Sequence, residues 1–112
     1  MEKTMTKKLL IARAEEEQRV FRLFLETASE ETVDELGCEY VLREDILRYL
    51  YDDDLLNTAQ AFALVASGRI LSRITDLLLS KYEGISDKDY IRSCVIEEAN
   101  NCVDRIYDLI EK

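Results

Sequence analysis

The feature that most constrains this 112-residue chain is its shortage of turn-forming residues. It contains no proline, and its three glycines are Gly37, Gly68 and Gly84. Folds with many strands need Gly and Pro at their turns, so this content disfavours a β fold. Apolar residues instead recur every three or four positions, a spacing typical of amphipathic helices. The sequence therefore predicts an all-α fold.

About five helices are expected, and the first and last are the longest. The first spans about Thr6 to Ala28, and the last begins near Ser86 and covers about 25 residues. Thr27 and Glu30 have the spacing of a capping box at the start of the second segment. For residues 30–51 two interpretations stay open, one kinked helix or two short helices separated at Gly37.

Three internal boundaries follow from residue chemistry. The triplet Asp52–Asp54 opposes helix continuation, because carboxylates meet the negative end of the helix dipole there. Asn57 and Gln60 form a capping-box pair, and Gly68 and Gly84 end the following helices. No linker divides the chain, and its length suits one core, so residues 1–112 are expected to form one compact helical bundle.

Composition disfavours catalysis and metal binding. The chain has no histidine, which excludes a Ser-His-Asp triad and histidine-liganded metals. Its carboxylates Glu17, Glu97 and Glu98 could serve acid–base chemistry only if buried, and no nucleophile stands beside a base. The contiguous acids at 52–54 lack the alternate spacing of a calcium loop. We therefore expect no enzyme, no metal and no cofactor.

Cysteine content and hydropathy point to the cytoplasm. Cys38, Cys94 and Cys102 are odd in number and lack CxxC spacing, which disfavours both a disulfide framework and a zinc site. No apolar stretch approaches the roughly 20 residues that a membrane-spanning helix needs. A cytoplasmic protein without a membrane partner is expected.

Acidic charge is concentrated in one block. The formal net charge is −9, and residues 29–56 carry ten acidic and two basic residues. Phosphate backbones repel such a field, so direct nucleic-acid binding is disfavoured and a protein partner with a basic surface is the electrostatic complement. Solubility alone could also account for the block. The candidate partner-binding acids are Glu30, Glu31, Asp34, Glu35, Asp52, Asp53 and Asp54.

The first helix offers alternatives to that acidic surface. Its apolar seam contains a single charge, Glu17, which lies either at an edge or in a buried pair with an Arg of another helix. Phe21, Phe24 and Leu25 could form the seam of a homodimer. Nucleic-acid contact is the weaker alternative, since acids interleave with the candidate cations. Those cations are Lys7, Lys8, Arg13, Arg19 and Arg22.

Six stretches of the chain carry a resemblance to known sequences: Tyr40–Leu47, Asp53–Leu55, Thr58–Ala61, Asp89–Arg92, Ile96–Glu97 and Ala99–Asn100. They resemble an uncharacterised family of small helical proteins, a domain of unknown function encoded by Firmicutes mobile elements. The resemblance implies a mobile-element origin and no agreed activity. Together with the charge, it leads us to expect a non-enzymatic binding protein that occludes a basic surface of a host protein, as an inhibitor does. The alternatives are a homodimeric structural or accessory module and a nucleic-acid-associated regulator.

Overall fold

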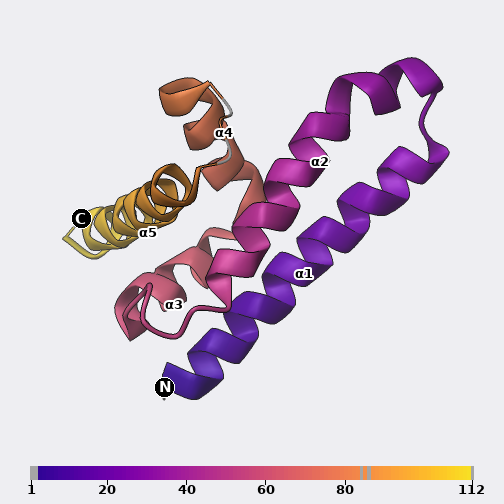
Figure 1. Cartoon of the computed structure of the whole chain (residues 1–112). Coiled ribbons are helices and arrows are strands. Elements are labelled where there is room, and N and C mark those ends of the chain that lie inside the picture. The colour runs from indigo at the N-terminus through magenta and orange to yellow at the C-terminus, as the bar shows by residue number, and fades with distance from the viewer. Residues whose placement is uncertain (1–2, 84, 86, 112) are drawn as a thin grey trace.

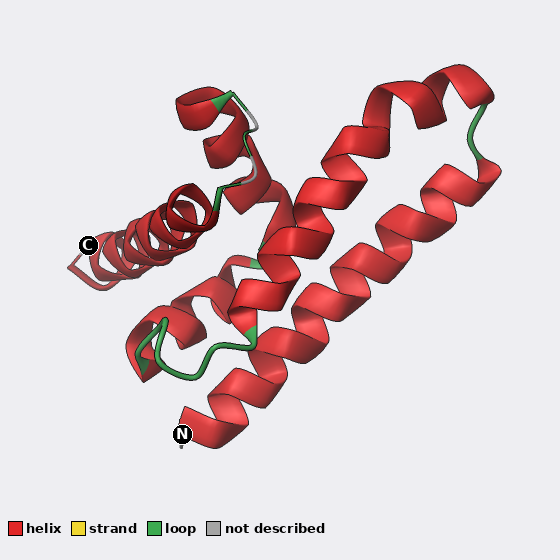
Figure 2. Ribbon diagram, viewed as in Figure 1, coloured by secondary structure: helices red, strands yellow, loops and turns green. Residues whose placement is uncertain are grey.

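The residues that the structure describes fold as five α-helices (Figures 1 and 2), which confirms the expected all-α class. The computed structural model describes residues 3–83, 85 and 87–111, with the backbone alone for Lys3 and Thr4. The helices are α1 (Lys3–Thr27), α2 (Glu30–Leu50), α3 (Thr58–Ser67), α4 (Leu71–Tyr82) and α5 (Lys88–Glu111). The first and last are the longest, at 25 and 24 residues, as the sequence predicts.

Helices α1 and α2 form a long antiparallel hairpin (Figure 1). Ser29 caps α2, because its hydroxyl accepts a hydrogen bond from the amide of Thr32 at 3.3 Å. The expected cap, Thr27, instead ends α1, and its hydroxyl donates to the carbonyl of Phe24 at 3.0 Å. The capping box predicted for Thr27 and Glu30 is therefore wrong by two positions. A helix cap needs extended backbone, and Ser29 has it (φ −68°, ψ 158°).

Helix α2 is continuous through Gly37, which decides between the two interpretations left open by the sequence. A glycine inside a helix costs about 1 kcal/mol relative to alanine, less than the packing of a 21-residue helix contributes. A glycine commonly ends a helix by adopting left-handed backbone, and Gly37 does not adopt it, since Gly68 is the glycine with positive φ among the described residues.

The remaining boundaries largely follow the predicted signals. Asn57 and Gln60 form the capping box of α3. The backbone N–H of Gln60 donates to Asn57 Oδ1 at 2.8 Å, and the backbone N–H of Asn57 donates to Gln60 Oε1 at 2.9 Å. Gly68 ends α3 in left-handed conformation at φ 76°. The stop expected at Gly84 and the cap expected at Ser86 lie outside the described residues.

The core lies where the base of the hairpin meets the other three helices. Helix α3 packs against α1 and α5, and α4 packs against α2 and α5. The largest fully buried apolar side chains come from all five helices or their caps: Leu10, Ile46, Leu64, Ile70, Leu71, Ile74, Leu78, Ile91 and Val95. The far end of the α1–α2 hairpin extends away from this body (Figure 1), within a molecule of 45 × 30 × 26 Å.

Candidate interaction site on the helical hairpin

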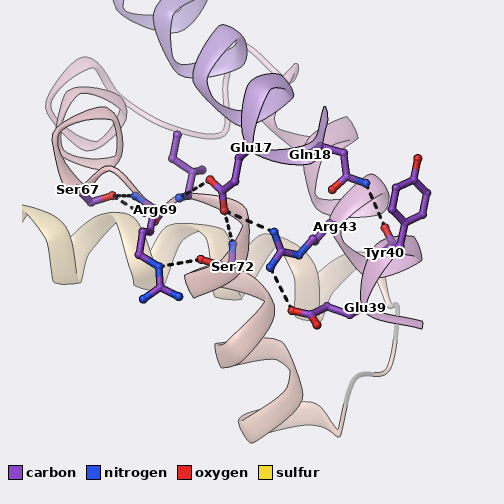
Figure 3. A network of polar contacts seen from close by, with 9 residues as sticks. Glu17, Gln18, Glu39, Tyr40, Arg43, Ser67, Arg69 and Ser72 are labelled. Carbon is purple, nitrogen blue, oxygen red and sulfur yellow. Dashed lines mark hydrogen bonds and ion pairs between the residues drawn. The ribbon is translucent and has the colours of Figure 1, made fainter. Parts of the chain in front are cut away.

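A polar junction attaches the hairpin to the body. Glu17 of α1 accepts hydrogen bonds from two backbone amides at the start of α4, Ile70 at 2.8 Å and Ser72 at 2.7 Å (Figure 3). Helix α4 has no side-chain cap of its own. A carboxylate is favourable there, because the first amides of a helix lack partners and the dipole is positive at that end. Glu17 therefore caps α4 from another helix.

Arg43 of α2 completes this junction. Its guanidinium lies 3.7 Å from Glu17 and 3.2 Å from Glu39, and it stacks 4.1 Å from the centre of the Phe21 ring. The Arg43 side chain is only 9% exposed, so the charge needs these partners. The sequence left two alternatives for Glu17, an edge position or a pair with an arginine of another helix. The structure shows the pair, with Arg43 of α2.

Beyond the junction, the hairpin has no buried residue. We call residues 19–41 the arm: every one of them is exposed or half-buried, whereas Gln18 on one side and Leu42 on the other are buried. Five large apolar side chains of the arm are more than a third exposed. They are Val20, Leu23, Phe24, Val33 and Val41. An apolar, protruding element of this kind is typical of an interaction surface.

The tip of the arm combines negative charge with a hollow that apolar and acidic residues line in equal number. The hollow has a volume of about 300 Å³, and Leu25, Ala28 and Val33 line it together with three carboxylates. We call the five exposed acids of this end the tip carboxylates; none forms an ion pair with a described residue. They are Glu26, Glu30, Glu31, Asp34 and Glu35.

A larger groove lies at the base of the arm, between α1 and the α3–α4 turn. It encloses about 550 Å³, and its apolar lining includes Val20, Phe24 and Val65. Two exposed arginines of its lining, Arg13 and Arg69, have no ion pair with any residue that the structure describes. We call it the basal groove. It differs from the tip in the sign of its unpaired charge.

The seven acids expected to form one face are not brought together. Glu30, Glu31, Asp34 and Glu35 lie in the first two turns of α2, and Asp52–Asp54 follow its last turn. A helix of 21 residues separates them by about 30 Å. One continuous acidic face, as the sequence block suggested, therefore does not form, because contiguity in sequence becomes distance along a helix.

The second acidic group is also compensated by cations of the chain itself. Asp52 pairs with Arg92 at 3.0 Å, and Asp53 pairs with Lys7. The backbone amide of Asp54, and then Arg92, lower the pKa of Asp52 below its ordinary value. These contacts join the end of α2 to α5 and α1, which is a structural role, so we do not include Asp52–Asp54 in the candidate site.

The expected dimer seam is likewise divided. Phe21 and Leu25 are half-buried, and the Phe21 ring stacks on Tyr40 of α2 at 6.3 Å between centroids. Phe24 is 51% exposed and faces the basal groove beside Val20. Of the three, Phe24 is the most exposed, whereas Phe21 packs within the hairpin and Leu25 lines the hollow at the tip.

The remaining candidates are engaged in internal contacts. Glu97 pairs with Lys81, and the buried Glu98 accepts from Cys102 Sγ at 3.3 Å and from Arg105 at 3.0 Å. Burial raises the pKa of the Cys102 thiol. Among the described residues, no three Asp, Glu or Cys side chains are grouped to hold a metal ion. Within the same residues, every helix is too short or too polar to cross a bilayer.

Sequence reasoning missed the basal groove and one tip carboxylate. Glu26 belongs to α1, and the hairpin turn brings it beside the α2 acids. Arg13 and Arg69 are 56 positions apart and meet only through the fold. The signal available beforehand was the stretch after Phe24, where the helical pattern continues without enough apolar residues to fill a core.

Comparison with known proteins adds no relative: neither a family model, nor a curated protein, nor a solved structure matches this chain.

Proposed function

We propose that this chain is a non-enzymatic interaction module whose arm engages a basic surface of a protein partner. The observation that carries the proposal is the tip: a hollow of about 300 Å³, lined by three apolar residues and by three carboxylates that have no ion pair with a described residue. Occlusion of the partner's basic surface would make such a module an inhibitor.

The chemistry of the hollow suits a lysine or arginine side chain. The aliphatic stem of such a side chain can pack against Leu25 and Val33, while its charged head reaches Glu26, Glu30 or Asp34. Opposite charge accelerates encounter, and the effect weakens with salt. The exposed Val33 and Val41 extend the apolar contact beyond one side chain.

A defined probe tests this proposal. The full chain is titrated into a labelled helical peptide that carries Lys and Leu at amphipathic spacing, and binding is followed by fluorescence anisotropy. The tip variant converts all five tip carboxylates to their amides. The matched control converts five exposed acids outside the arm to amides, namely Asp76, Glu83, Asp104, Asp108 and Glu111.

The tip variant should bind the peptide at least about tenfold more weakly than the wild type, and the difference should shrink when salt rises from about 0.05 to about 0.3 M. The control variant has the same net charge as the tip variant and should retain most of the affinity. Equal weakening by both variants would show that total charge, rather than the tip, attracts the peptide, and would overturn the proposal.

A further inference from the structure

We infer that the basic surface engaged by the arm is the basal groove of a second copy of this chain, so that two copies pair their arms in antiparallel orientation. The inference rests on the proposed function, because it uses the same tip carboxylates. It adds the identity of the partner and the arrangement of the two copies.

The first argument is charge complementarity within one molecule. Unpaired negative charge is concentrated at the tip, and the unpaired positive charges Arg13 and Arg69 line the basal groove. A surface with both signs at its two ends is complementary to itself when it is rotated by half a turn. Such self-complementarity is what an isologous two-fold dimer requires. Parallel pairing would place ten tip carboxylates together, and like charges would oppose it.

The second argument is the spacing along α1. Val20 and Phe24, which face the groove, are four residues apart, so a two-fold axis midway lies near residue 22. Arg13 is nine residues from that point, or about 13 Å along the helix, and the hairpin turn at Ser29 is seven residues away, or about 11 Å. Antiparallel pairing about this axis therefore brings Arg13 of each copy to the axial level of the partner's hairpin turn, where the tip carboxylates lie.

The third argument is the apolar surface between these charges. Val20 and Phe24 are 54% and 51% exposed, and Val20 of one copy would face Phe24 of the other copy across the axis. Covering them removes from water the apolar side chains that the groove presents, while Arg69 on the α3–α4 turn forms an outer rim beside Arg13. An apolar centre within a charged rim is the usual anatomy of a specific interface.

The experiment is a charge exchange followed by sedimentation equilibrium of the full chain. One variant carries Arg13→Glu and Arg69→Glu, and the other carries Glu26→Lys and Glu30→Lys. Thermal unfolding by circular dichroism verifies that both fold. The wild type should be a dimer at high micromolar concentration, and each variant alone should be a monomer. An equimolar mixture of the two should form heterodimers, since one charge contact is then the native one and the other is restored with its charges reversed.

Phe24→Ser supplies a second disruption without a charge change, and it should weaken dimerisation by about tenfold or more because Phe24 lies at the centre. A wild type that remains monomeric up to about 1 mM overturns the inference. So does a dimer that survives all these variants, since it must use another surface. If the chain is monomeric yet the tip still governs peptide binding, the dimer fails while the proposed function stands. If charge exchange behaves as expected but the tip variant binds the peptide as tightly as the wild type does, the dimer stands and the proposed function fails.

Discussion

Removal of the Glu17 carboxylate tests whether one residue of α1 holds the hairpin to the body. Glu17→Ala leaves the amides of Ile70 and Ser72 without their acceptor and takes one partner from Arg43. Loss of a helix cap costs about 1–2 kcal/mol. Arg43 keeps Glu39 at 3.2 Å, so the lost ion pair adds only about 1 kcal/mol. The expected destabilisation is about 2–3 kcal/mol, a large part of the stability of a small domain.

The assay is urea unfolding followed by circular dichroism. With an m-value of about 1.5 kcal/mol/M, the midpoint should fall by about 1–2 M and the slope should stay constant. Glu17→Gln should lose about half as much stability as Glu17→Ala. The amides of Ile70 and Ser72 donate to different carboxylate oxygens, and a glutamine side chain has only one oxygen. The neighbouring Glu16→Ala is the matched control: Glu16 and its partner Arg19 are exposed, so the urea midpoint of this variant should stay close to that of the wild type. Equal effects of Glu16→Ala and Glu17→Ala would refute the capping argument.

Four other measurements follow from the structure. Asn57→Ala should cost about 1 kcal/mol in urea unfolding, because it removes the cap of α3. Gly37→Ala should stabilise by about 0.5–1 kcal/mol, since the position is helical and an added Cβ meets nothing within 4 Å. The lowered pKa of Asp52 means that its contribution is present above the ordinary carboxyl pKa and is lost as pH falls, so wild type and Asp52→Asn should differ in stability at pH 7 and converge near pH 2. A thiol reagent should modify the exposed Cys38 rapidly and spare Cys94 and Cys102, whose pKa values burial raises, until the chain unfolds; three equal rates would contradict this.

The parts of the fold that the sequence could predict are those governed by local chemistry. The long first and last helices follow from periodicity, and the start of α3 follows from two side chains three positions apart. The continuity of α2 could not be predicted, because Gly37 is a plausible stop whose cost is offset only by the packing of the rest of the helix. The partner of Glu17 could not be predicted either, since Arg43 and Ile70 are 26 and 53 positions away.

The candidate site was predicted only in part for the same reason. The four acids Glu30, Glu31, Asp34 and Glu35 do belong to the exposed tip, whereas Asp52 pairs with Arg92 and Asp53 pairs with Lys7. A charge summed over a block of sequence includes acids that the folded helix places at its two opposite ends. The same sum counts a carboxylate in an ion pair and a carboxylate without one as equal. The distinction needs the positions of the chain's own cations, which only tertiary structure supplies.

That distinction also argues that the tip serves more than solubility. Glu30 and Asp34 are four positions apart on one helix, as are Glu31 and Glu35, and each such like-charge pair costs about 0.2–0.5 kcal/mol. The helix dipole offsets this for the first-turn acids Glu30 and Glu31, but not for the acids of the next turn. Acids placed for solubility alone could be spaced over the exposed faces without this repulsion. Their concentration around a hollow that is partly apolar, without an ion pair to any described residue, is instead the arrangement that a cationic partner would neutralise.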